Sequence, residues 1–65
     1  MRGTLKSLRL NRGISQEDMA RALDIPMDIY VLWEKDFGSV KAHDGERMAR
    51  ILGVKLDDII IDEHE

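Results

Sequence analysis

The chain has 65 residues, enough for one small domain and too few for a second hydrophobic core. It contains no cysteine, so we expect neither disulfides nor a cysteine-ligated zinc site to stabilise it. The formal net charge of −3 argues mildly against nucleic-acid binding. However, residues 57–65 hold five acidic residues and no lysine or arginine, which leaves ten basic against eight acidic residues elsewhere. The domain before this acidic end is weakly basic, which permits DNA binding without requiring it.

The chain shows no targeting or membrane-spanning pattern. Its first residues lead directly into an amphipathic stretch and lack the long apolar run of a secretory signal. The late apolar run Ile59–Ile61 is far too short to span a bilayer. We therefore expect a soluble, cytoplasmic protein with no membrane partner.

The first half of the chain has the pattern of two short helices. Leu5 and Leu8 begin an apolar stripe at helical spacing, and Gly13 suits the left-handed position that ends such a helix. Ser15 is a good N-cap for a second helix, whose first turn carries two acidic residues. Met19, Ala20 and Leu23 form the buried face that we expect for this helix.

A tight connection precedes the third helix. Asp24 must take the left-handed backbone conformation there, which aspartate tolerates better than most residues. Pro26 is acceptable in the first turn of a helix that we expect to span residues 27–35, with Tyr30 and Trp33 on one face.

The second half predicts a loop and two more helices. The loop spans residues 35–42, and a fourth helix follows over residues 43–52. Gly45 inside that helix is interpreted as a local weakness of about 1 kcal/mol relative to alanine. A short fifth helix is expected at Leu56–Ile61, followed by the acidic end at 62–65. The sequence thus predicts an all-α, compact five-helix bundle in one domain, residues 1–61, with a helix-turn-helix unit at about 15–35.

Several segments match a known domain family at unbroken spacing. They are LKSLR at 5–9, RGISQEDMA at 12–20, Leu23, WE at 33–34, ARILGV at 49–54 and LDDII at 56–60. Together they resemble the Cro/C1-type (XRE family) helix-turn-helix domain of phage repressors and small bacterial regulators. The resemblance implies a lambda-repressor-like fold and a stand-alone transcription regulator, such as a repressor. Such a regulator binds double-stranded DNA and places its third helix in the major groove.

The resemblance also implies roles for individual residues. Gln16, at the start of the second helix, is expected to touch a phosphate or reach a base. Arg9 and Glu34 match a pair that ties the first helix to the end of the third. Lys35 and Lys41 are the phosphate candidates near the following loop, with Arg47 as a weaker one. Phe37 is expected to anchor the loop on the core.

The predicted recognition helix departs from the family pattern. Its outward positions fall on Met27, Asp28, Val31 and Leu32, with Ile29 nearby, where the family often has polar or basic residues. Apolar side chains can touch a thymine methyl but cannot bind a purine edge, and a carboxylate can accept only from a group such as cytosine N4. The resemblance therefore implies the fold more firmly than it implies a DNA sequence.

The apolar third helix leaves a second function open. A helix that is apolar nearly all round is normally buried on more than one side, and an exposed apolar patch marks an interface. The alternative is a helix-turn-helix fold used as a protein-interaction module, antitoxin-like or partner-binding, with weak or no sequence-specific DNA binding. A homodimer is also expected, with Ile61 as its candidate contact.

An enzyme, a metal site and a cofactor are not expected. The sequence has no plausible Ser-His-acid set and no phosphate-binding glycine loop. His43-Asp44 and Glu63-His64-Glu65 resemble metal ligands only locally, and we interpret them as isolated surface groups.

Overall fold

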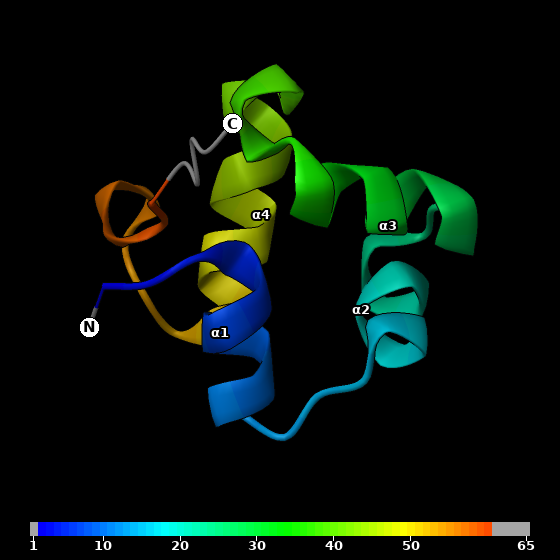
Figure 1. Cartoon of the computed structure of the whole chain (residues 1–65), viewed down its shortest axis with the longest axis horizontal. Helices are drawn as coiled ribbons and strands as arrows, with labels where there is room; N and C mark the ends of the chain where they lie inside the picture. Colours follow the sequence, from blue (N-terminus) through cyan, green and yellow to red (C-terminus); the bar gives the residue numbers. More distant parts are fainter. Residues whose placement is uncertain (1, 61–65) are drawn as a thin grey trace.

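The computed structural model describes residues 2–60, and this part of the chain contains four α-helices and two short 3-10 turns. Figure 1 shows α2 and α3 side by side on the right, with α1 and α4 to their left. The elements in chain order are α1 (Leu5–Asn11), α2 (Gln16–Leu23), α3 (Met27–Lys35), η1 (Phe37–Ser39), α4 (Ala42–Leu52) and η2 (Leu56–Asp58). The prediction of an all-helical domain is confirmed in this range.

The ends of α1 and α2 follow from local capping chemistry. Ser15 Oγ accepts a 3.0 Å hydrogen bond from the backbone N–H of Asp18, as expected for its N-cap position. Thr4 caps α1 in the same way, its Oγ1 accepting from the N–H of Ser7 at 3.1 Å. Gly13 has a φ of +70°, which confirms the left-handed position after α1. These short-range bonds therefore fix the start of each helix and its direction.

The core lies where the helices converge. Tyr30 of α3 and Met48 of α4 are both fully buried in it. Ile59 joins the core from the C-terminal side. The other buried core residues come from α1, α2 and α4: they are Leu5, Leu8, Met19, Ala20, Leu23, Ala49 and Leu52. Within residues 2–60, no helix has the length and apolar character that crossing a membrane requires.

The expected fifth helix is wrong. The chain forms only the turn η2, and Ile59 then has an extended backbone, with φ −88° and ψ 112°. The reason is a contact with the other end of the domain: the N–H of Gly3 donates to the carbonyl of Asp58 at 2.9 Å, and the N–H of Ile60 donates to the carbonyl of Gly3 at 2.8 Å. β-Branched isoleucines favour this extended conformation. A helix through residue 60 would lose both bonds.

Gly45 has a packing role that the sequence interpretation missed. It lies buried in α4, and a Cβ built there would lie 2.9 Å from Leu56 Cδ1 and 3.3 Å from Phe37 Cζ. The absence of a side chain lets η1 and η2 approach α4 closely. The residue is therefore a contact point for two turns, and its low helix propensity is not simply a weakness.

Candidate nucleic-acid interface

Residues 16–35 form two helices joined by the three-residue connection Asp24–Pro26. Asp24 has φ 60° and ψ 47°, the left-handed conformation that the sequence predicts for this position. The N–H of Ile25 donates to the carbonyl of Ala20 at 3.0 Å, which closes the end of α2 before the chain turns into α3. This connection holds α3 across α2 and leaves one long side of α3 uncovered.

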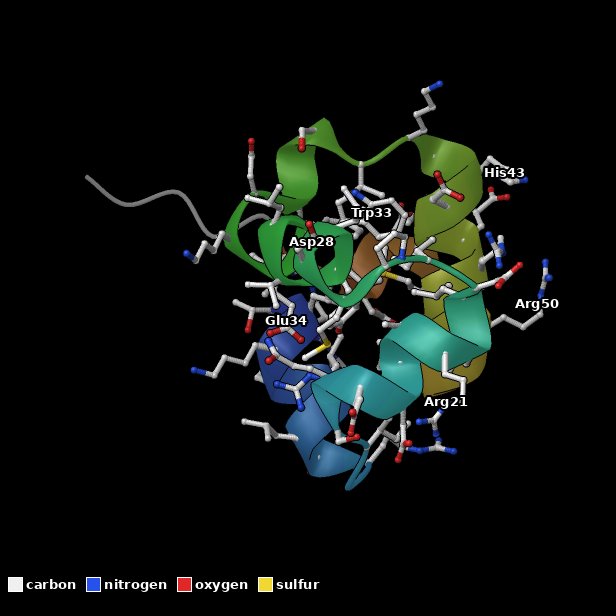
Figure 2. The ribbon with its side chains drawn as sticks, turned by 90° about the vertical axis from the view of Figure 1, so that its right-hand side faces the viewer. Arg21, Asp28, Trp33, Glu34, His43 and Arg50 are labelled. Atoms are coloured by element: carbon white, nitrogen blue, oxygen red, sulfur yellow. The ribbon has the colours of Figure 1, made fainter. Side chains whose placement is uncertain are left out.

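Opposite sides of α3 face different neighbours. Figure 2 views α3 nearly end-on from its first turn, with Trp33 on the side toward α4 and Glu34 on the side toward α1. Trp33 is partly buried against the core, and Tyr30 is completely buried. Because these two residues fix the rotation of the helix, residues 28, 32 and 35 face away from the domain.

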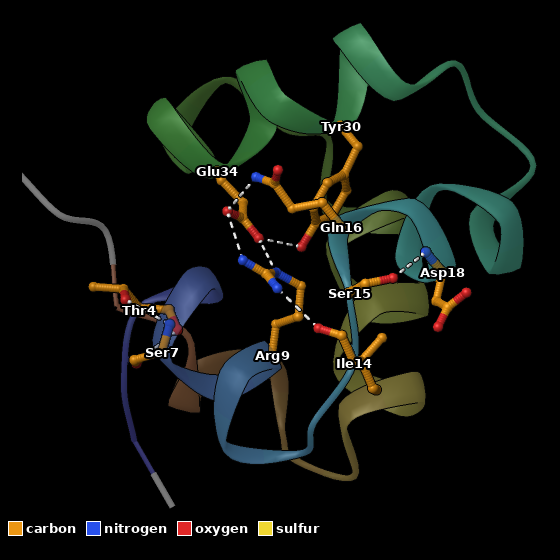
Figure 3. Close-up of polar contacts among 9 residues, drawn as sticks. All are labelled: Thr4, Ser7, Arg9, Ile14, Ser15, Gln16, Asp18, Tyr30 and Glu34. Atoms are coloured by element: carbon orange, nitrogen blue, oxygen red, sulfur yellow. Dashed lines mark hydrogen bonds and ion pairs between the residues drawn. The ribbon is translucent and has the colours of Figure 1, made fainter.

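A polar network around Glu34 fixes the position of α3 (Figure 3). Arg9 Nε donates to Glu34 Oε2 at 2.5 Å, and the hydroxyl of Tyr30 donates to the same oxygen at 2.6 Å. Gln16 Nε2 donates to Glu34 Oε1 at 3.0 Å. Arg9 Nη1 also donates to the carbonyl of Ile14 at 2.8 Å. One carboxylate thus connects α1, the start of α2 and α3, and the structure brings Arg9 and Glu34 together.

Burial and pairing shift the pKa values of three groups in this network. Hydrogen bonding to Glu34 raises the pKa of Arg9 above its usual value, and burial only partly opposes this. Burial by itself raises the pKa of Glu34, but hydrogen bonds from Arg9, Tyr30 and Gln16 outweigh it and leave that pKa below its usual value. Burial and the bond to Glu34 raise the pKa of Tyr30. At neutral pH the network therefore holds one ion pair and a neutral phenol.

The structure gives Gln16 a partner that the sequence did not indicate. A carboxylate can only accept hydrogen bonds, so Glu34 requires the NH₂ end of the Gln16 amide to face it. The carbonyl oxygen and the second N–H of that amide are then left for an external ligand. Gln16 and Glu34 are 18 residues apart, and the sequence carries no signal that pairs them. The DNA contact of Gln16 stays a prediction.

Three of the five exposed residues of α3 are apolar. Leu32 is 57% exposed, Met27 41% and Ile29 37%, whereas Val31 is half-buried. Asp28 is exposed, and its Oδ1 accepts a 3.0 Å hydrogen bond from the N–H of Ile29. Apolar side chains thus outnumber the two charged ones, Asp28 and Lys35, on the exposed surface of α3, so a ligand of α3 can gain from apolar contact.

The expected phosphate contacts do not all remain open. Lys35 and Lys41 are exposed at the end of α3 and immediately before α4. Arg47 is half-buried and donates to the carbonyl of Leu23 at 2.8 Å, which ties α4 to α2. Phe37 is partly buried against the core, so its expected role as a loop anchor is confirmed. Arg47 is therefore a structural residue in this conformation.

The residues considered for metal binding or dimerisation do not belong to α2 or α3. His43 Nδ1 is 3.4 Å from Asp44 Oδ1 on an exposed part of α4. Over residues 2–60, no three histidine, cysteine or acidic side chains converge as a metal site would require. Glu63, His64, Glu65 and the proposed dimer contact Ile61 lie outside the described residues.

Comparison with known proteins agrees with this geometry. The helix-turn-helix family model matches residues 5–59. The chain belongs to the Cro/C1-type helix-turn-helix family. The cryptic phage CTXphi transcriptional repressor RstR of Vibrio cholerae is 28% identical to this helix-turn-helix chain over 58 residues, which are 89% of the chain. The chain spans about half of that repressor, 52% of its length. No solved structure matches significantly.

Proposed function

We propose that the protein is a non-enzymatic, DNA-binding transcription regulator that places α3 in the major groove. The observation that carries this proposal is the uncovered side of α3, held in a fixed orientation by the family's helix-turn-helix arrangement. Similarity to a phage transcriptional repressor supports the same function. The expectation of a cytoplasmic location rests on the proposed DNA target.

In the proposed complex, contacts to phosphates orient the domain, and α3 meets the base edges. Gln16 lies at the start of α2, where a helix N-terminus offers free N–H groups to a phosphate. Lys35 and Lys41 are exposed cations, at the end of α3 and immediately before α4. Met27, Asp28, Val31 and Leu32 belong to the helix that meets the bases. Few cations contribute, so the proposed affinity of a single domain is modest and falls with added salt.

A dimer would compensate for that modest affinity. Two copies of one helix-turn-helix bind the two half-sites of an inverted repeat. We propose that the C-terminal isoleucines mediate this contact, with Ile61 as the candidate residue. Ile60, which is 40% exposed beside the core residue Ile59, provides apolar surface next to it.

Selection from a random duplex library tests the DNA-binding proposal. The purified chain is incubated with the library at near-physiological salt, and bound duplexes are amplified and sequenced. Enrichment of a short inverted repeat is the expected result. Background binding that falls with salt and enriches no sequence would contradict sequence-specific regulation.

The exposed apolar residues of α3 also favour a second function, in which α3 binds a protein partner. Leu32 and Met27 together offer the apolar surface that protein interfaces bury. Leu32→Lys would abolish such a complex, because it places a charge in the interface. If Leu32→Lys leaves protein association intact and strengthens DNA binding, the interaction hypothesis is wrong.

A further inference from the structure

The first two turns of α3 present no hydrogen-bond donor in their side chains to an external ligand. Residues 27–32 include one side chain with a donor, Tyr30, and it is fully buried and donates to Glu34. Asp28 can only accept when it is ionised. The other members of this segment are Met27, Ile29, Val31 and Leu32.

The start of α2 lies outside this segment and adds one side-chain donor, on Gln16. Gln16 directs one amide N–H to Glu34 at 3.0 Å, which leaves its carbonyl oxygen and one N–H for a ligand. The N–H of Ile29 is bonded to Asp28 Oδ1. Guanine offers two acceptors, N7 and O6, in the major groove, and reading them requires donors. The first two turns of α3 therefore cannot read guanine through their side chains.

The major groove contains one apolar group that matches exposed aliphatic side chains, the C5-methyl of thymine. We propose that Leu32, together with Met27 or Ile29, reads thymine C5-methyl groups, so that the target contains thymines at fixed positions of each half-site. This inference rests on the proposed function, since it names the chemistry that α3 reads once it lies in the groove. The exposed apolar residues then serve DNA recognition and require no protein partner.

The expected loss of affinity follows from the free energy of moving apolar groups out of water. Burial of one methyl or methylene group changes a binding constant by about fourfold. Each contacted thymine that loses its methyl should therefore weaken binding by about that factor. A dimer on an inverted repeat doubles the number of contacted methyls, so complete removal is expected to weaken binding by more than tenfold.

Replacing thymine by uracil tests the proposal, because it removes the methyl and leaves base pairing unchanged. Two random duplex libraries are prepared, identical except that one contains deoxyuridine in place of thymidine. The full chain is expected to enrich a thymine-containing motif from the first library and to lose it from the second. The enriched duplex, prepared in both forms, then gives the ratio of the two dissociation constants.

Two variants test whether Leu32 causes the difference in affinity between the thymine and uracil duplexes. Leu32→Ala should weaken binding to the thymine duplex and reduce the thymine-to-uracil ratio, and circular dichroism checks its fold, which the 57% exposure of Leu32 should protect. Lys35→Ala is the matched control, because loss of a phosphate contact weakens both duplexes equally and preserves the ratio.

The outcomes separate the inference from the proposed function. The same motif with equal affinity in both libraries would overturn methyl reading and leave DNA binding intact. The proposal would also be overturned if Leu32→Ala, Met27→Ala and Ile29→Ala each kept the wild-type ratio of affinities for the thymine and uracil duplexes. DNA shape would then explain the preference for thymine. Failure of both libraries to yield a motif would contradict sequence-specific binding itself and remove the inference with it.

Discussion

The hydroxyl of Tyr30 donates a 2.6 Å hydrogen bond to Glu34 Oε2, one helical turn further along α3. Tyr30 is fully buried, so this bond satisfies a polar group that cannot reach water. It also holds the carboxylate that receives Arg9 and Gln16. A residue of the hydrophobic core is thus directly joined to the network that orients the proposed interface.

We predict that Tyr30→Phe destabilises the domain by about 1–3 kcal/mol, because the variant loses a hydrogen bond to a charged group and keeps the ring packing. Urea unfolding followed by circular dichroism measures the change. An equal free energy of unfolding in variant and wild type would show that the bond adds nothing to stability.

Removing the charge of Glu34 should have a larger effect. Glu34→Gln leaves the guanidinium of Arg9 without its ion-pair partner, and Arg9 is only 5% exposed. We expect the free energy of unfolding to fall by about 3 kcal/mol or more. Asp18→Asn is the control, because its pair with Arg21 is largely exposed and contributes about 0–1 kcal/mol. The double variant Arg9→Met with Glu34→Leu leaves no buried charge. Its free energy of unfolding should therefore fall by less than the sum of the decreases in the single variants Arg9→Met and Glu34→Leu.

The lowered pKa of Glu34 predicts acid sensitivity. In the folded state this pKa lies below the usual value of 4.5. A lowered carboxyl pKa adds stability that is complete above the unfolded-state pKa and is lost as the pH falls through the folded-state pKa. The free energy of unfolding of the wild type should therefore decrease as the pH is lowered below about 4.5. In Glu34→Gln the part of this decrease that Glu34 causes should be missing. If the free energy of unfolding of that variant falls with acid as steeply as that of the wild type, Glu34 is not the source of the acid sensitivity.

The exposed lysines should control the salt dependence of DNA binding. Lys35→Ala and Lys41→Ala are each expected to weaken binding and to reduce the slope of log K against log salt by about one. Lys55→Ala is the control, because Lys55 immediately precedes η2, on the left of Figure 1, while α3 lies on the right. An equal effect of Lys55→Ala would mean that the proposed face is wrong.

The close approach at Gly45 predicts intolerance of a side chain. Gly45→Val should destabilise the domain by about 2 kcal/mol or more, because Leu56 and Phe37 must move away from α4. Glu46→Val introduces the same side chain at the next, exposed position and should cost less than about 1 kcal/mol. Similar thermal unfolding of the two variants would show that the turns adapt easily.

Features that depend on neighbours in the sequence could be predicted. Ser15 caps the helix that follows within three residues, and Asp24 adopts the left-handed conformation demanded by a three-residue connection. The bounds of α3 at residues 27–35 follow from the same local pattern. The family resemblance pairs Arg9 with Glu34, and it supplies the long-range information that composition and periodicity lack.

Features that depend on residues far apart in the sequence could not be predicted. The extended backbone at Ile59 arises from bonds to Gly3, so the local helical pattern of residues 56–61 was misleading. Gly45 looked unfavourable because its benefit lies in two turns that approach from other parts of the chain. The orientation of Gln16 depends on a carboxylate 18 residues away.

The bridge between Gly3 and Ile59 has a consequence for fusion proteins. It brings the segment before α1 next to the segment after η2, on the side of the molecule away from α3 (Figure 1). An affinity tag or second domain joined ahead of Gly3 would start from this side, so a fluorescent reporter could be placed there for binding measurements while α3 stays accessible.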